Sequence, residues 1–129
     1  YILVIHLRME KLTKAEEPIM HWLWKCKKAF VKEIIEKLPD PKPPYNTVSS
    51  IIRVLVDKGM VGYESFGRTH RYFAILSKNE YRAWLFKSVI SDYFDGSYSS
   101  IVSHIVDNEK LSDNDMEEIK NLINNKVEP

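Results

Sequence analysis

The feature that most constrains how this chain can fold is a change of hydrophobic period at Gly59. Upstream of it, apolar residues recur every three or four positions, which is the spacing of amphipathic helices. Downstream, residues 60–66 and 70–75 have the composition of two short strands, and Gly67 begins a three-residue turn between them. The sequence therefore predicts helices first and a β-hairpin after them.

Three helices are predicted before the hairpin. The segment 13–16, Thr-Lys-Ala-Glu, is a capping box, in which a hydroxyl and a carboxylate satisfy free amides at the start of the first helix. A second helix over 31–38 ends at the proline-rich segment 39–44, because proline cannot continue a helix. A third, over 46–58, has a buried stripe of valine, isoleucine and leucine and ends before a glycine. Three helices and a hairpin within residues 9–76 predict a winged helix-turn-helix domain in a mainly α chain.

The remainder of the chain predicts three more helices. A second capping box, Ser77 to Glu80, opens a long helix, and two shorter ones follow. These helices carry many large apolar side chains in about 50 residues, and a core that small is marginal by itself. Pairing with the same segment of a second chain would complete it, so residues 77–126 are predicted to form a helical dimerisation domain. Its predicted contact residues are Trp84, Tyr93, Phe94, Ile101, Ile105, Ile119, Leu122 and Ile123.

Charge is distributed unevenly along the chain, although the formal net charge is only +1. Residues 9–72 contain twelve basic and eight acidic side chains, a balance of +4. Residues 73–129 contain six basic and ten acidic side chains, a balance of −4. This asymmetry indicates that the first half faces a polyanion and that the second half has another role.

The third predicted helix carries the most informative polar face. A helix can enter the major groove of DNA when its outward side chains are short and present donors and acceptors to base edges and phosphates. Asparagine addresses adenine, arginine addresses guanine or phosphate, and the methyl group of threonine contacts thymine. The side chains with these properties are Asn46, Thr47, Ser49, Ser50 and Arg53. The alternative is an ordinary solvated face, since serine and asparagine are common on surfaces.

The turn of the hairpin adds further candidates for DNA contact. Arg68, His70 and Arg71 lie at or beside this turn, where a winged domain contacts phosphates. Arg71 has an alternative role as a structural ion-pair partner. Tyr45, just before the third helix, is predicted either to hydrogen-bond a phosphate or to pack as a hydrophobic staple. A basic cluster around the end of the first helix, interpreted mainly as solvating charge, contains Lys25, Lys27, Lys28 and Lys32.

The sequence offers no catalytic or metal-binding constellation. Its four histidines share no ligand spacing, and it contains neither a His-Glu-x-x-His motif nor a phosphate-binding glycine loop. The single cysteine, Cys26, excludes an intramolecular disulfide and is predicted to be a small core residue beside Trp22, Leu23 and Phe30. We therefore expect no enzymatic activity, no cofactor, no metal, and a reducing, cytoplasmic location.

No segment has the roughly 20 consecutive apolar residues that a membrane-spanning helix needs, so no membrane insertion is predicted. Residues 1–8 are apolar but short, and they lack the charged start and the cleavage site of a secretory signal. We treat these eight residues as an extension and assign them no function.

Several short motifs occur in a fixed order along the chain. They are Leu12-Thr13-x-Ala15-Glu16, Ile19-Met20 and Leu23-Trp24 in the first helix, Tyr45-Asn-Thr47-Val48 and Leu55-x-x-Lys58-Gly59 in the third, Gly67-Arg68 and Tyr72 in the hairpin, and Tyr93-Phe-Asp-Gly96, Asn108-Glu109-x-Leu111-Ser112 and Glu118-Ile-x-x-Leu122 in the tail. In this order and spacing, over residues 11–124, the chain resembles the penicillinase-repressor type of bacterial regulators, the BlaI/MecI/CopY group.

The resemblance implies a homodimeric repressor that blocks transcription by occupying a palindromic operator in double-stranded DNA. It also implies relief of repression by proteolysis in the C-terminal helices, triggered by a membrane-bound sensor metalloprotease. The Asn-Phe cleavage pair of the family aligns here with His104-Ile105, which departs from the family pattern. The paired cysteines of the copper-sensing branch are missing from the tail, so release by copper is not predicted.

Two other functions are compatible with the sequence. A winged-helix module can serve protein–protein contact, because that fold is not confined to DNA binding. Such a module would not retain DNA even at low salt. Alternatively, the chain is a regulator whose small-molecule effector binds among Trp84, Phe86 and Tyr93, and it would then show a thermal shift with that ligand.

Overall fold

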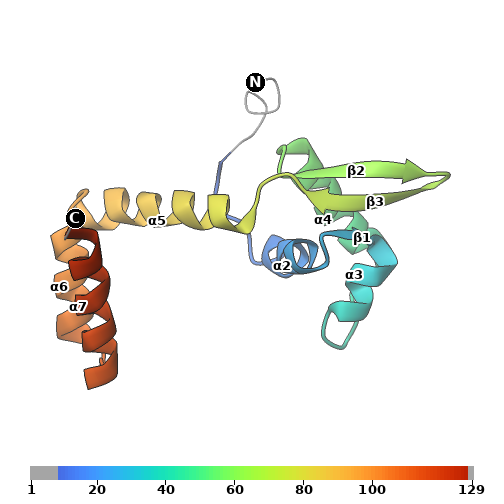
Figure 1. Ribbon diagram of the computed structural model, residues 1–129. Helices are drawn as coiled ribbons and strands as arrows, with labels where there is room; N and C mark the ends of the chain where they lie inside the picture. Colours follow the sequence, from blue (N-terminus) through green and yellow to red (C-terminus); the bar gives the residue numbers. More distant parts are fainter. Residues whose placement is uncertain (1–8, 128–129) are drawn as a thin grey trace. The chain divides into compact units, whose positions relative to one another are not determined.

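The computed structural model describes residues 9–127 of the chain, so residues 1–8, to which the sequence assigned no function, lie outside the described part (Figure 1). Its elements, in chain order, are α2 (Glu16–Cys26), β1 (Lys28–Phe30), α3 (Val31–Lys37), α4 (Tyr45–Asp57), β2 (Val61–Phe66), β3 (Thr69–Ala74), α5 (Lys78–Phe94), α6 (Tyr98–Asn108) and α7 (Asp113–Val127). Two compact units divide the chain, one ending at Leu85 and one beginning at Phe86. The predicted mainly helical fold, with an N-terminal winged helix-turn-helix followed by C-terminal helices, is confirmed.

Both predicted capping boxes form as hydrogen bonds. At the start of α2, the backbone N–H of Glu16 donates to Thr13 Oγ1 at 3.2 Å, and the N–H of Thr13 donates to Glu16 Oε1 at 2.9 Å. Ser77 and Glu80 make the same exchange before α5, at 3.0 and 2.9 Å. Because these bonds satisfy amides that have no partner inside a helix, α2 and α5 begin where the sequence predicts.

The core of the first unit lies between the inner faces of its helices and the sheet. Its buried residues are Leu12, Ile19, Met20, Leu23, Ala29, Val31, Ile34, Leu38, Val48, Ile52, Leu55, Met60, Val61, Leu76 and Tyr81. Tyr81 belongs to α5, and its hydroxyl accepts a hydrogen bond from the N–H of Leu12 at 2.9 Å. The first turns of α5 therefore pack with the winged domain, and the boundary between the units falls inside this helix rather than at residue 77.

The sheet has three antiparallel strands in the order β1-β3-β2. Phe66 pairs with Thr69 at the end of the hairpin, so Gly67 and Arg68 form the turn, and Gly67 has a φ of 62°. That conformation favours glycine, which explains why glycine begins the turn. The sequence predicted only two strands; it missed β1 because three residues are too few to show a strand period.

A buried ion pair joins the end of α4 to the start of α2. The Nζ atom of Lys58 lies 2.9 Å from Glu16 Oε2 and 2.8 Å from Glu10 Oε1. The side chains of Lys58 and Glu16 are only 9% and 5% exposed. The hydrogen bond to Glu10, together with the pairing to Glu16, outweighs the effect of burial and raises the pKa of Lys58. The carboxylate of Glu16 thus caps α2 and also holds the C-terminal end of α4 through Lys58.

Cys26 is exposed, so the prediction that it is a core residue is wrong. It is the last residue of α2, and Lys27 then takes the unusual backbone angles φ 70° and ψ −51°, which turn the chain into β1. Cys26 therefore lies at the exposed end of the helix and not in the core. The small buried residue of this segment is instead Ala29, on β1.

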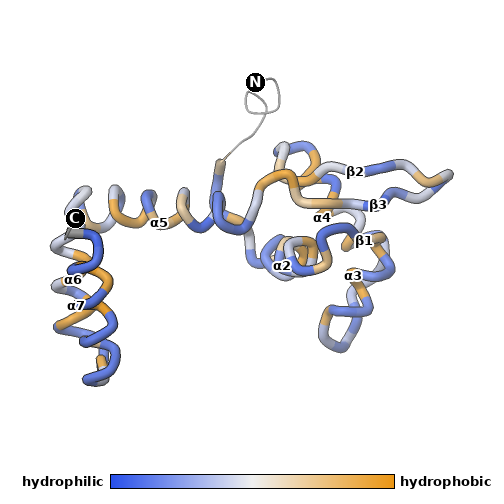
Figure 2. The backbone as a smooth tube through the Cα atoms, viewed as in Figure 1, coloured by the Kyte–Doolittle hydropathy of each residue, from blue (hydrophilic) through white to orange (hydrophobic). Residues whose placement is uncertain are grey.

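The second unit leaves most of its apolar side chains uncovered. Within residues 86–126, Ile90 is the only buried side chain. The exposed large apolar residues are Phe86, Val89, Tyr93, Tyr98, Val102, Ile105, Val106, Met116, Ile119, Leu122 and Ile123. Apolar and polar segments alternate along α6 and α7 (Figure 2). A single copy of the chain therefore provides this unit with almost no core of its own.

In the part of the chain that the structure describes, no helix combines the length and the hydropathy needed to cross a bilayer.

Candidate nucleic-acid interface

Helix α4 turns one face to the core and the opposite face outward. Val48, Ile52 and Leu55 are buried at helical spacing, which anchors the inner face. On the other side, four of the predicted contact residues are exposed and one is half-buried. They are Asn46, Thr47, Ser50 and Arg53, which are exposed, and Ser49, which is half-buried. The polar side chains of this helix are therefore free of the protein's own core.

A groove with a volume of about 470 Å³ lies between α4 and the hairpin. Its lining residues are Tyr45, Ser49, Arg53, Val56 and Asp57 from α4, Tyr63, Arg68, Thr69, His70 and Tyr72 from the hairpin, and Val31 from α3. The tertiary structure thus brings together residues from two elements that the sequence had named separately. The lining contains the guanidinium groups of Arg53 and Arg68 and one carboxylate, that of Asp57. The net charge of the groove is therefore positive.

Aromatic rings form the hairpin side of this groove. The ring of His70 lies 4.4 Å from that of Tyr63 and 6.1 Å from that of Tyr72, measured between ring centroids. Ser65 Oγ lies 3.3 Å from His70 Nδ1. Partial burial raises the pKa of Tyr72. Its phenol hydroxyl can donate a hydrogen bond.

Arg71 lies on the other face of the hairpin, because neighbouring side chains of a strand point to opposite faces. One of its terminal nitrogens is 3.4 Å from Glu64 Oε1, and its guanidinium carbon is 4.9 Å from the ring centroid of Phe66. Lys28 on β1 also pairs with Glu64, at 2.9 Å. Arg71 does not line the groove, and its contacts match the structural ion-pair role that the sequence left open.

Sequence reasoning missed one exposed residue of α4. Val54 is 45% exposed, although valine is an apolar residue and stands in the sequence between members of the predicted buried stripe. It follows Ser50 by four positions and Thr47 by seven, so the three side chains share the outer side of the helix. This spacing is visible in the sequence, but a valine among other apolar residues gives no sign of which face of the helix it occupies.

The chemistry available in this region is hydrogen bonding and positive charge. Hydroxyl, phenol, amide and guanidinium groups can address phosphates and base edges. Among residues 9–127, no cluster of three histidine, cysteine, aspartate or glutamate side chains could hold a metal ion. The groove and the outer face of α4 together have the properties of a surface that binds nucleic acid.

The predicted dimerisation and cleavage residues fall in different places. Trp84 packs against the core of the first unit, and its ring centroid lies 6.0 Å from that of Tyr81. The other residues predicted for dimerisation lie in the second unit. His104 and Ile105 are exposed on α6, and the His104 ring contacts that of Phe94 with centroids 5.8 Å apart.

Comparison with known proteins gives a consistent result. The profile of the penicillinase repressor family matches residues 12–125. The chain is 26% identical over 117 residues to the methicillin resistance regulatory protein MecI of Staphylococcus aureus strain N315, covering 90% of this chain and 95% of that protein. It is 22% identical over 121 residues to the penicillinase repressor of Bacillus licheniformis, covering 90% and 91%. Since the family profile spans both units of the fold, this chain belongs to the penicillinase repressor family.

Proposed function

We propose that this protein is a homodimeric transcriptional repressor that binds a palindromic operator in double-stranded DNA in the cytoplasm. The observation that carries the proposal is the groove between α4 and the hairpin, which gathers Arg53, Arg68 and His70 beside an exposed face of short polar side chains. Its family relatives are named as repressors and regulators, which supports the same role.

The division of labour follows from the position of each side chain. Asn46, Thr47 and Ser50 on the outer face of α4 address base edges in the major groove. The groove residues Tyr45, Ser49, Arg53, Arg68 and His70 address the neighbouring phosphates. Arg71 acts indirectly, since its pairing with Glu64 stiffens the hairpin that carries Arg68.

Dimerisation would set the spacing of the two recognition helices. The exposed apolar residues of the second unit supply a surface that a second copy can cover. A twofold dimer places two α4 helices about one turn of DNA apart, ~34 Å, which matches a palindromic site.

Proteolysis by a membrane-bound sensor metalloprotease is the proposed route of release. The region of His104 and Ile105 is exposed, and the unit around it has a single buried side chain within residues 86–126. A segment with so few buried contacts opens locally at small cost, which a protease needs before it can cut a helix. Cleavage there would remove α7 and weaken the dimer.

The test is a mobility-shift titration with duplex DNA selected from a random pool, at several salt concentrations. We expect two-fold symmetric sites and an affinity that falls steeply with salt, because bound phosphates release counterions. Absence of DNA retention even at low salt would overturn the proposal and favour a protein–protein module.

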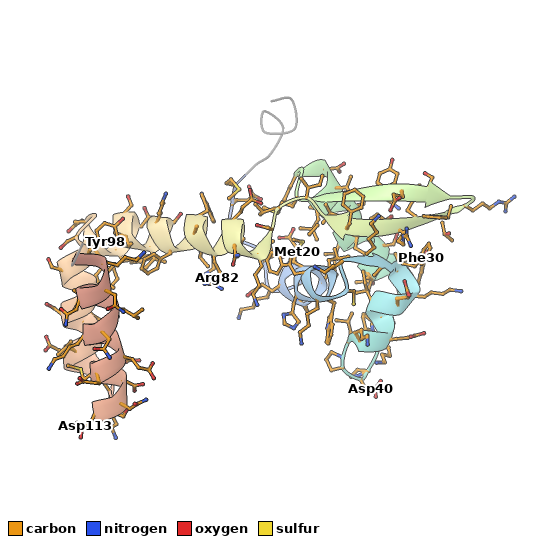
Figure 3. The ribbon with its side chains drawn as sticks, viewed as in Figure 1. Met20, Phe30, Asp40, Arg82, Tyr98 and Asp113 are labelled. Atoms are coloured by element: carbon orange, nitrogen blue, oxygen red, sulfur yellow. The ribbon has the colours of Figure 1, made fainter. Side chains whose placement is uncertain are left out.

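Replacing Arg68 by alanine is expected to weaken binding to all DNA sequences alike. The slope of log affinity against log salt should fall by about 1, because one phosphate contact is lost. Titration of one selected and one unrelated duplex measures both effects. Arg82→Ala, which removes an exposed arginine of α5 outside the groove (Figure 3), is the matched control and should leave the slope unchanged. An unaltered slope in Arg68→Ala would contradict the phosphate assignment.

Val54 is expected to contact the methyl group of a thymine. Replacing that thymine by uracil should weaken wild-type binding about fourfold, which corresponds to the roughly 0.8 kcal/mol of one buried methyl group. The Val54→Ser variant should bind the duplex with thymine and the duplex with uracil with equal affinity. Uracil is substituted at each thymine of the selected site in turn, and identical profiles for the two proteins would refute the contact. Replacing Asn46 or Thr47 should instead alter which site is selected.

A further inference from the structure

A second hollow of the first unit lies among the end of α2, the end of β3 and the start of α5. It has a volume of about 360 Å³ and is lined by His21, Leu23, Trp24, Lys25, Lys27, Ala74, Ser77 and Lys78. None of these residues lines the groove between α4 and the hairpin. This basic pocket is therefore separate from the proposed DNA interface.

The charge of the basic pocket is one-sided. Three lysines and a histidine line it, and no carboxylate does. Within residues 9–127, none of these lysines lies within 4.0 Å of a carboxylate oxygen, whereas the neighbouring Lys28 pairs with Glu64 at 2.9 Å. The carboxylate of Glu80, on the adjacent first turn of α5, accepts a hydrogen bond from the N–H of Ser77. Of the three, Lys25 lies over the ring of Trp22, with Nζ 5.4 Å from the ring centroid. Cations that have no carboxylate partner concentrate positive potential in the hollow and attract an anion.

The backbone at Lys27 adds to this arrangement. Its φ of 70° and ψ of −51° are rarely adopted by residues other than glycine. Its N–H still closes α2 by donating to the carbonyl oxygen of Leu23 at 2.9 Å. The strained turn thus places a lysine beside the pocket, at a position that glycine would occupy with less strain. Backbone strain of this kind is often retained where it serves function.

Apart from Ser77, apolar residues form the rest of the lining. Leu23, Trp24 and Ala74 lie among the charged groups. The indole N–H of Trp24 donates to the carbonyl oxygen of Leu76 at 2.8 Å, so this ring is held in place and presents an apolar wall. A pocket with cations on one part and a fixed aromatic ring on another suits an anion that is attached to an apolar or ring-shaped body.

We propose that the basic pocket binds the phosphate group of a small phosphorylated molecule. Lys27 and Lys78 hold the phosphate. Trp24 contacts the body of the ligand. The same phosphate chemistry could be offered by the backbone of DNA, so the experiment separates the two sources.

The experiment is a calorimetric titration of the full chain with adenosine monophosphate and, in parallel, with inorganic pyrophosphate. We expect saturable binding of the nucleotide and a shift of the Trp24 indole N–H signal in nuclear magnetic resonance spectra. Lys78→Gln and Lys27→Gly should each weaken binding roughly tenfold, the factor given by losing one charged hydrogen bond. Lys27→Gly should also keep or raise the melting temperature, because glycine relieves the turn, so its weaker binding would not reflect unfolding.

The matched control is Lys14→Gln, which removes an exposed lysine outside the pocket and should bind as the wild type does. No saturable binding of either probe up to roughly 10 mM would overturn the proposal. Equal weakening by Lys14→Gln and Lys78→Gln would also overturn it, because the effect would then be one of general charge. If Lys78→Gln leaves nucleotide binding intact but lowers the salt slope of DNA binding, the phosphate in the pocket belongs to DNA and the small-molecule assignment is wrong.

Discussion

The Leu122→Lys variant is expected to be monomeric and to bind palindromic DNA about 10²- to 10³-fold more weakly than the wild type. Leu122 is 67% exposed on α7, in a unit whose residues 86–126 include only one buried side chain. A lysine ammonium at this position would have to be desolvated in the dimer interface, which disfavours association. Without the dimer, each winged domain binds its half-site alone and the gain from linking two half-sites is lost.

Sedimentation equilibrium measures the first effect, and mobility shifts with a full palindrome and with a single half-site measure the second. The variant should bind the half-site as the wild-type domain does, because α4 and the hairpin are unchanged. Asn121→Lys introduces the same charge at the neighbouring exposed position of α7 and is the control. A Leu122→Lys protein that stays dimeric with full affinity would show that the second unit pairs through another surface or not at all.

The Lys58→Met variant is expected to lower the free energy of unfolding of the winged domain by about 3–5 kcal/mol. Lys58 is the partner of Glu16, whose carboxylate is 5% exposed and would be left buried without its cation. The melting temperature should fall by more than about 10 °C. Because pairing raises the pKa of Lys58 above its ordinary value of 10.5, the stabilisation is present throughout the neutral range. It is lost as the pH rises through the raised pKa of Lys58.

Thermal and denaturant unfolding followed by circular dichroism measures this effect. The double variant Glu16→Gln/Lys58→Met should recover much of the loss, since no buried charge then remains. Lys28→Met, which removes a cation from the exposed pair with Glu64, is the control and should change stability little, because water screens that pair. Equal losses in Lys58→Met and Lys28→Met would mean that burial of the Glu16 pair is not what stabilises the end of α4.

These two variants act on different parts of the repressor. Leu122→Lys removes the linkage between two intact winged domains, whereas Lys58→Met weakens the scaffold that holds α4 in each of them. Half-site binding separates the two cases, because only the second variant should lose it as the temperature rises.

Local signals predicted the elements of the fold well. The capping boxes at Thr13 and Ser77 form as hydrogen bonds between residues three positions apart, so neighbouring residues suffice to predict them. The spacing of the apolar residues predicted α4 and the hairpin for the same reason. Cys26 was misplaced because its burial depends on where α2 ends, and the chain reversal at Lys27 has no local sequence signal.

The candidate site was predicted as a set of residues but not as a surface. The sequence named Arg53 and Arg68 from different elements, and only the packing of the hairpin beside α4 places both along one groove. It named both His70 and Arg71 as candidates for DNA contact and left an ion-pair role open for Arg71, whereas strand geometry sends the two to opposite faces. The register that decides between these faces is set by pairing with β2 and β1.

By itself, the sequence determined which segments form the helices and the hairpin and which polar residues α4 carries, because these properties depend on neighbours within a few positions. Tertiary structure alone decided that Glu16 pairs with Lys58, that Arg71 pairs with Glu64 rather than lining the groove, and that Lys27 and Lys78 share one pocket. Each of these relations joins residues far apart in the chain or depends on strand register. They arise from how the elements pack, and the order of residues along the chain does not specify that packing locally.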